Sequence, residues 1–431
     1  MLKAIAQRVG LVLFGVALAF IVAEIGVRML GFAPSELYTY DPYVGWKLKP
    51  GASGWQTHEG HAFVSVNDDG FRGPDYSFQK PPGTMRVAVI GDSFTEGQQV
   101  ADDDTFSAVA QRILQAQCPF QFIGKDGKPR IIDRVEVMNF GCDGYGTAQE
   151  LITLKRWVWR YSPDLVVLMF FSGNDMRNNS AVLEGDKCRP FYVYRDGQLV
   201  LGGPFEDSWS FRMHCMIRFE SRHSRLLDLM GSGKKVLVHM VRKPFEHIRA
   251  PIVMKHLPHG FELGLNDVIY APPKTPVWED AWRVTDAELE MTNADVKAHG
   301  AIFIVATAGT GIQDDPNPEF REKYMKFVGS TSLFYPDDRI RALGEKDGFD
   351  VLNLPKPMEA YAQEHHVYLH GFPNTSPGIG HWNETGHRLA GEFLAQRIRA
   401  LLEAQPAAGA TTPSPPVKSS AATDAPANAA P

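Results

Sequence analysis

Cysteine is scarce in this sequence, and positive charge is not in excess. The four cysteines among 431 residues form no CxxC pair and no zinc spacing, so we expect no metal site and no cofactor: Cys118, Cys142, Cys188 and Cys215. They are compatible with one or two disulfides in an oxidising compartment, or with none. Lys and Arg number 44 against 50 Asp and Glu, for a net charge of −6. This balance argues against a nucleic-acid partner.

Only one apolar run is long enough to cross a membrane. It extends over 9–27, is interrupted only by Glu24, follows Lys3 and Arg8 and precedes Arg28. A bilayer-spanning helix needs about 20 such residues. The flanking charges predict a cytoplasmic 1–8, a single-pass anchor over 9–28 in the inner membrane and a periplasmic remainder. A signal peptide cleaved near Ala17-Leu18-Ala19 and a buried core helix are the alternatives.

The two ends of the exported part differ in composition from its middle. A membrane-proximal segment over 36–84 is rich in Gly, Pro and aromatic residues, with a short strand expected at Val64–Val66 and a turn over 67–70. The end of the chain, 405–431, is mostly Ala, Pro, Ser and Thr, and it predicts a disordered tail.

The middle of the chain alternates apolar β-branched runs with helical patterns. This alternation over 85–403 predicts an α/β fold, a three-layer sandwich around a doubly wound parallel sheet. The expected strands are 87–90, 135–140, 165–171, 301–306 and 351–354. The expected helices are 107–115, 147–160, 285–299 and 383–403.

A long insertion over 178–280 separates the third and fourth predicted strands. Within it, 211–256 carries ten Lys or Arg against three acids, with apolar residues interleaved. This stretch is either an amphipathic cap whose basic face meets water or a surface for anionic lipid or glycan.

Polar and Gly-rich turns follow the first three strands. Gly91-Asp92-Ser93-Phe94 ends the first strand, and it lacks both the Gly-Lys-Ser/Thr of a P-loop and the second glycine of G-x-S-x-G, which is Thr95 here. Gly144 lies in the turn after the second strand, and Asn174 lies in the turn after the third. If the first strand lies between the other two, Ser93, Gly144 and Asn174 meet at the topological switch point. A hydroxyl nucleophile with N–H donors is what acyl transfer requires.

A serine nucleophile also needs a base, and His381 is the candidate. It precedes the closing helix, which Asn383 could cap, in a loop at the same edge of the sheet. His387 would lie within that helix as a packing or surface residue.

These residues together resemble the SGNH (or GDSL) hydrolases. Gly91-Asp92-Ser93 resembles the first block of that family, Gly144 the second, Asn174 the third and His381 the last. The likeness extends over about 85–400 and implies a flavodoxin-like sheet of order 2-1-3-4-5 and an oxyanion hole made by Ser93, Gly144 and Asn174. Gly70-Phe71-Arg72-Gly73 also resembles a segment of membrane-anchored bacterial members, which favours an anchor.

One departure from the family concerns the orienting acid. Members usually carry Asp three residues before the histidine, whereas this position is Gly378 here. The orienting acid is therefore unknown from the sequence: it comes from elsewhere in the chain, or a Ser-His dyad acts without one.

Three functions follow from these patterns. The first is a serine esterase that removes acyl or acetyl groups from an extracytoplasmic carbohydrate or envelope ester. The second is an O-acetyltransferase of an exported polysaccharide, in which a sugar hydroxyl instead of water resolves the acyl-enzyme. The third is a non-catalytic glycan-binding pseudoenzyme, for which Gly378 is the only support. The acyl group, the acceptor and the oligomeric state are not encoded in any recognisable pattern.

Overall fold

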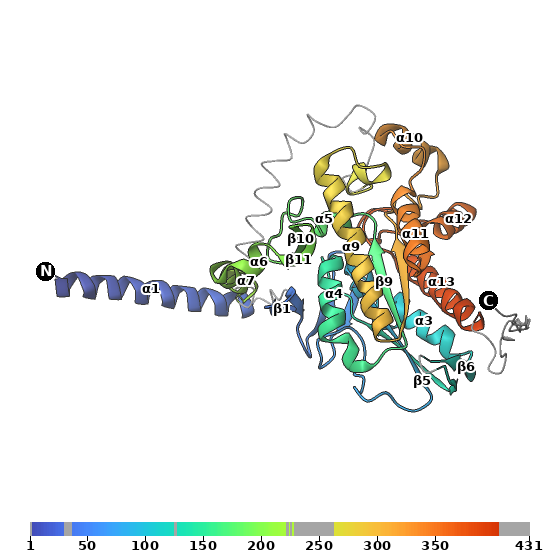
Figure 1. Cartoon of the computed structure of the whole chain (residues 1–431). Helices are drawn as coiled ribbons and strands as arrows, with labels where there is room; N and C mark the ends of the chain where they lie inside the picture. Colours follow the sequence, from blue (N-terminus) through green and yellow to red (C-terminus); the bar gives the residue numbers. More distant parts are fainter. Residues whose placement is uncertain are drawn as a thin grey trace, which may run out of the picture.

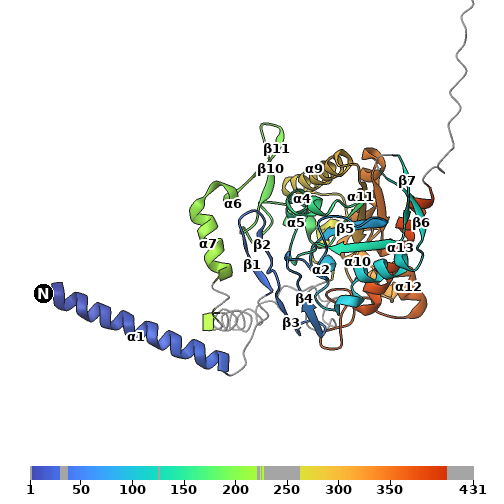
Figure 2. The same ribbon diagram turned by 90° about the horizontal axis from the view of Figure 1, so that it is seen from below.

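The computed structural model of the chain shows one long helix leading to an α/β body (Figures 1 and 2). The structure describes residues 2–29, 37–124, 127–220, 224, 226–227 and 263–404. Helix α1 (Leu2–Met29) projects away from the body, and most of its apolar side chains from Val9 onward are exposed. Its segment Gln7–Met29 is long and apolar enough to cross a membrane, as a single span or as part of a signal sequence.

The body is built on a five-stranded parallel sheet. Its spatial order is β13-β12-β9-β5-β8, and each neighbouring pair is parallel. Numbered along the chain, this is the order 2-1-3-4-5, so the predicted topology is confirmed. The strands are β5 (Thr84–Gly91), β8 (Arg134–Asn139), β9 (Leu165–Phe171), β12 (Ile302–Ala308) and β13 (Asp350–Asn353).

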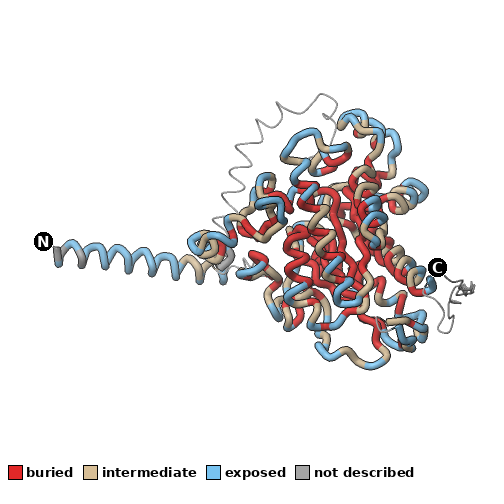
Figure 3. The backbone as a smooth tube through the Cα atoms, in the orientation of Figure 1, coloured by how far each residue is buried: buried red, intermediate tan, exposed pale blue. Residues whose placement is uncertain are grey.

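Helices cover both faces of the sheet because its central strands are apolar on both sides (Figure 3). In β5, Val87 and Val89 face one helical layer, and Ala88 and Ile90 face the other. The first layer holds α3 (Phe106–Gln115), α12 (Pro355–His365) and α13 (Glu384–Glu403). The second holds α4 (Thr147–Arg156), α9 (Pro276–Ala298) and α11 (Tyr335–Asp347).

Two helices differ in extent from the sequence prediction. Helix α4 ends at Arg156, and a separate 3-10 turn follows over Val158–Tyr161. Helix α9 begins at Pro276, nine residues before the predicted start at 285. Proline is tolerated in a first helical turn because its missing N–H would have no partner there. The residues from 276 therefore belong to the α/β core and not to the insertion.

The segment over 37–84 is more structured than predicted. It forms two antiparallel hairpins: β1 (Tyr38–Asp41) with β2 (Gly45–Leu48), and β3 (Ser53–Gln56) with β4 (Ala62–Ser65). The buried Arg72 donates to the carbonyls of Glu96 and Val100 at 2.8 and 2.6 Å. This segment is thereby fastened to the loop that follows β5.

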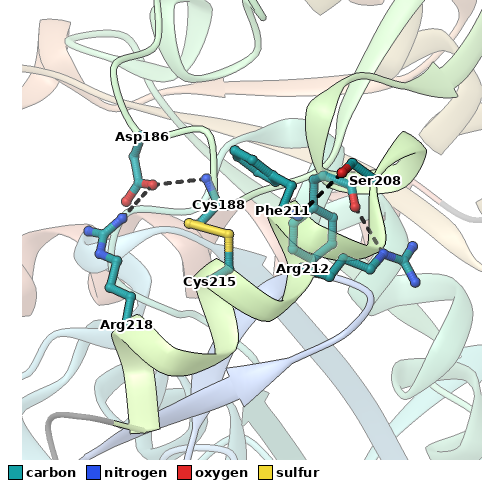
Figure 4. Close-up of a disulfide and its surroundings, with 8 residues drawn as sticks. Asp186, Cys188, Ser208, Phe211, Arg212, Cys215 and Arg218 are labelled. Atoms are coloured by element: carbon teal, nitrogen blue, oxygen red, sulfur yellow. Dashed lines mark hydrogen bonds and ion pairs between the residues drawn. A yellow bond between two sulfur atoms is a disulfide. The ribbon is translucent and has the colours of Figure 1, made fainter.

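The described part of the insertion includes a hairpin and two helices, and a 3-10 turn over Asp267–Tyr270 that precedes α9. The hairpin and the two helices are β10 (Phe191–Arg195), β11 (Gln198–Gly202), α6 (Pro204–Asp207) and α7 (Trp209–Glu220). A disulfide between Cys188, just before β10, and Cys215 links α7 to the chain that enters the hairpin (Figure 4). Most of the basic stretch 211–256 and the whole tail 405–431 lie outside the described residues.

The remaining elements are short. A hairpin of β6 (Phe120–Ile123) and β7 (Pro129–Ile132) leads into β8, and α10 (Pro318–Val328) follows β12. Two one-turn helices, α2 (Ser93–Glu96) and α5 (Asp175–Asn178), begin where β5 and β9 end. Ser93 is the first residue of α2, and Asn174 immediately precedes α5.

Candidate active site

Ser93 lies at the first position of a one-turn helix at the carboxyl edge of the sheet. The sequence predicted the next helix only at 107, whereas α2 begins at Ser93 itself. The carboxylate of Asp92 accepts the N–H of Phe94 at 2.9 Å and so caps the turn. The first N–H groups of a helix have no intrahelical acceptor. The Ser93 N–H is therefore available to a bound oxygen atom.

His381 contacts Ser93 directly, although 288 positions separate the two residues. The distance from His381 Nε2 to Ser93 Oγ is 2.8 Å. His381 lies in the loop before α13, and the side chain of Asn383 caps that helix by accepting the N–H groups of Thr385 and Gly386. The predicted cap is confirmed. The cap at Asn383 therefore anchors the loop to the helix two residues after His381. The imidazole of His381 is only 24% exposed.

The sequence did not identify the third residue of this arrangement, Glu59. Its Oε2 lies 2.6 Å from His381 Nδ1, and its Oε1 accepts the backbone N–H of His381 at 2.6 Å. With the Nδ1 proton donated to Glu59, Nε2 of the neutral imidazole accepts the hydroxyl proton of Ser93. Glu59 therefore occupies the place of the orienting acid in a serine–histidine–acid triad.

Glu59 comes from the loop between β3 and β4, outside the α/β core. Asn374 holds this loop against the loop that carries His381. Its amide donates to the carbonyls of Thr57 and Gly60 at 3.0 and 2.9 Å, and its Oδ1 accepts the N–H of Gly60 at 3.0 Å. A lone glutamate in such a loop has no sequence pattern, so only the folded chain reveals it.

Glycines in the His381 loop make room for Glu59. Gly380 has φ +91°, and a Cβ there would lie only 1.9 Å from Glu59 Oε1. At Gly378, where the resembled family carries its acid, a Cβ would press on the ring of Tyr368 at 3.0 Å. The chain therefore has no acid at Gly378, and Glu59 of the β3–β4 loop contacts His381 instead.

The charges around His381 raise the pKa of its imidazole. Burial opposes the imidazolium, but the hydrogen bond and charge of Glu59, with the charges of Asp143 and Asp92, outweigh it and raise the pKa of His381. Burial also opposes the carboxylate of Glu59, but the contact with His381 lowers the pKa of Glu59 overall. Burial raises the pKa of Asp92 to about 7.

The turn that carries Gly144 is attached to α2. Asn139, at the end of β8, donates its amide to the Thr95 carbonyl at 2.6 Å. The buried carboxylate of Glu96 accepts the N–H of Asp143 at 2.6 Å. Gly144 follows at once, with φ +73° and partial exposure. Its turn is therefore held beside the helix that Ser93 begins.

Asn174 lies at the start of α5, directly after β9. Its Oδ1 accepts the side-chain amide of Asn178 at 3.3 Å, which leaves the NH₂ of Asn174 directed elsewhere. Because β5 lies between β8 and β9, the turns of Ser93, Gly144 and Asn174 share one edge of the sheet.

His387 has a packing environment, in agreement with its predicted place inside the closing helix. Its ring is 1% exposed, stacks with Phe106 and accepts the Phe106 N–H at Nδ1. Burial lowers the pKa of His387 to about 3, so this side chain is neutral near pH 7.

No family model matches the sequence, and no curated protein matches it either. Solved structures do match. The chain is similar to a solved lipolytic protein of the G-D-S-L family and to solved esterases. A lipolytic protein of the G-D-S-L family from Desulfitobacterium hafniense is 10% identical, with a TM-score of 0.31, over 72% of this chain and 98% of that one. An acetylxylan esterase from Geobacillus stearothermophilus is 12% identical, with a TM-score of 0.35, over 74% and 96%. A lipase/acylhydrolase from Enterococcus faecalis is 14% identical, with a TM-score of 0.33, over 74% and 97%. At these identities and TM-scores, the likenesses assign no role to any residue of this chain.

Proposed function

We propose that this protein is a serine-dependent ester hydrolase in which Ser93 is the nucleophile and His381 the general base. The observation that carries the proposal is the continuous hydrogen-bonded line from Ser93 Oγ through the imidazole of His381 to the carboxylate of Glu59. A nucleophile, its base and a group that orients the base are the parts of covalent acyl transfer.

The reaction proceeds through an acyl-enzyme. Ser93 Oγ attacks the ester carbonyl while its proton passes to His381 Nε2, and the carbonyl oxygen becomes an oxyanion. The N–H groups of Ser93 and Gly144 and the amide of Asn174 are the proposed donors to that oxyanion. The tetrahedral intermediate then expels the alcohol, which takes the proton from His381. Water, activated by the same imidazole, attacks the acyl-enzyme and releases the acid and free Ser93.

Glu59 has two roles in this scheme. It accepts the Nδ1 proton, so the lone pair of Nε2 faces Ser93, and its negative charge stabilises the imidazolium that forms in each step. The pseudoenzyme hypothesis relied on the missing acid at Gly378, and Glu59 removes that support.

The substrate we propose is an acylated carbohydrate or other envelope ester outside the cytoplasmic membrane, with the chain anchored by one helix. The exposed apolar helix Gln7–Met29 supports a single span of the inner membrane with a periplasmic body. The disulfide between Cys188 and Cys215 supports an oxidising compartment independently of that helix.

The test uses the full chain in detergent with a chromogenic acetyl ester, in the presence and absence of glycan acceptors. Release of free acetate at the same rate with or without acceptor supports the esterase. Acetylated glycan in place of free acetate would identify the O-acetyltransferase instead. The Ser93→Ala variant should be inactive in both assays, because the esterase and the acetyltransferase reactions require the same acyl-enzyme.

A further inference from the structure

Arg189, in the insertion, is buried with donors that have no partner. Its side chain is 4% exposed, and its Nε and Nη1 have no hydrogen-bond acceptor within the described part of the chain. Buried polar groups in folded proteins are nearly always hydrogen-bonded, and an unpaired buried cation is costly. A guanidinium in this condition has donors to offer to an acceptor on a bound molecule.

Nearby acids do not satisfy Arg189, although their charges act on it. Glu184 and Asp186 favour its charged form, against the larger effect of burial, which lowers the pKa of Arg189. Asp186 accepts hydrogen bonds from Arg218 and from the N–H of Cys188. Glu184 Oε1 accepts the N–H of Asp186, whereas its Oε2, 3.7 Å from Arg177 Nε, has no hydrogen-bond partner within the described residues. Neither carboxylate is hydrogen-bonded to Arg189.

The position of Arg189 is fixed by its surroundings. It directly follows Cys188, which the disulfide to Cys215 holds against α7 (Figure 4). The carbonyl oxygen of Cys188 packs against Gly45, and a Cβ on residue 45 would lie only 2.0 Å from that oxygen. The guanidinium lies 4.9 Å from the centre of the Trp46 ring, whose Nε1 donates to the carbonyl of Asp143 at 2.9 Å. These contacts fix the position of the cation.

The guanidinium adjoins the turn that supplies Gly144. Arg189 Nη2 lies 3.9 Å from where a Cβ on Gly144 would be. The carboxylate of Asp143 acts electrostatically on both Arg189 and His381, so the two cationic groups lie in one neighbourhood.

We propose that Arg189 is a specificity residue that binds an anionic oxygen group of the substrate, a carboxylate or a phosphate, beside the ester that Ser93 attacks. The planar guanidinium matches either group in two-point geometry. The inference rests on the proposed esterase function for the ester, but the anion site is testable without turnover.

The experiment measures binding by calorimetry to the full chain in detergent, carrying Ser93→Ala so that the probes persist. The probes are acetylated glucuronic acid, acetylated glucose 6-phosphate and acetylated glucose. A hydrogen-bonded ion pair at Arg189 predicts at least about tenfold tighter binding of one or both anionic sugars than of the neutral one. Preference for the carboxylate or for the phosphate identifies which anion the site takes.

Variants assign this preference to Arg189. Adding Arg189→Gln should abolish the tenfold difference, and Arg189→Lys should restore part of it. Arg195→Gln is the matched control, because Arg195 is an exposed arginine of β10 paired with Asp207; its binding ratios should equal those of the parent.

The outcomes separate this inference from the proposed function. Equal binding of all three probes to the parent overturns the anion site, whether or not the variants fold. If the wild-type protein hydrolyses acetylated glucose but the Ser93→Ala protein binds all three probes equally, the proposed esterase function is supported and Arg189 has only a structural role. If no probe is hydrolysed but the Arg189-dependent preference persists, the esterase is wrong and the anion site stands.

Discussion

The carboxylate of Glu59 binds His381 twice, at Nδ1 of its imidazole and at its backbone N–H, at 2.6 Å each, across 322 positions of the chain. The acid therefore belongs to a hairpin loop ahead of the α/β core, not to the segment that carries the histidine. This relationship makes the upstream hairpins part of the site.

Replacing Glu59 should impair turnover more than binding. In Glu59→Gln the amide supplies no negative charge for the imidazolium and can stabilise the wrong tautomer, so kcat should fall by about 10³ to 10⁴ with little change in KM. Steady-state kinetics with a chromogenic acetyl ester measure this. Glu364→Gln, at an exposed position of α12, is the control and should match the wild type. A Glu59→Gln enzyme of normal kcat would mean that His381 needs no acid.

The pH dependence of kcat/KM should report the raised pKa of His381. The free enzyme needs a neutral imidazole, so activity should be lost as the pH falls through a pKa above the ordinary value of about 6.5. Glu59→Gln removes the charge that stabilises imidazolium, so its residual activity should persist to lower pH. An acid limb that stays in place or moves to higher pH in Glu59→Gln would contradict this electrostatic role.

Gly380→Ala should damage the site through a steric clash. The new Cβ would overlap Glu59 Oε1, which the structure places 1.9 Å away. Gly197→Ala is a matched control, because Gly197 has a similar φ of +78° and no atom within 4 Å of a Cβ. Both variants carry the backbone strain, expected to cost about 1 kcal/mol of unfolding free energy, but only Gly380→Ala should lose most of its ester turnover. Equal activity of the two variants would disprove the clash.

Two buried acids behind the site should destabilise the protein at high pH. Glu150 and Glu288 are fully buried, and none of their carboxyl oxygens has a partner within the described residues. Burial, and then the charges of neighbouring acids, raise the pKa of each well above its ordinary value. Each stays protonated in the fold but ionises in the unfolded chain above a pH of about 4.3, so stability falls as pH rises beyond that value. Glu288→Gln should therefore raise Tm, with a gain over wild type that widens between about pH 5 and pH 8. A constant or shrinking gain would count against a protonated Glu288.

Thiol counting tests the disulfide. The denatured, unreduced protein should react with iodoacetamide at Cys118 and Cys142 only, because these two cysteines are free. After reduction, Cys188 and Cys215 should react as well. Peptide mass spectrometry of material from an oxidising compartment would show this. Full alkylation before reduction would remove the independent support for an extracytoplasmic location.

Much of the fold could be predicted because buried parallel strands are continuous apolar runs and their order follows from known packing rules. All five core strands were recognised within a few residues. Ser93, Gly144, Asn174 and His381 could be predicted as site candidates, since each follows a strand or precedes a helix at one edge of the sheet, and the structure brings Ser93 and His381 into contact. Glu59 and Arg189 were not, because a single charged residue in a loop has no periodicity. Their surroundings are defined only when the hairpin over 53–65 and the disulfide-bridged insertion pack onto that edge.

The most direct measurement is mass spectrometry of the full chain after reaction with a fluorophosphonate, which traps an activated serine. We expect one adduct on the peptide that contains Ser93, absent in Ser93→Ala and formed much more slowly in His381→Ala and in Glu59→Gln. No adduct on a folded protein, or an adduct that survives Ser93→Ala, would contradict the claim that Glu59 and His381 activate Ser93.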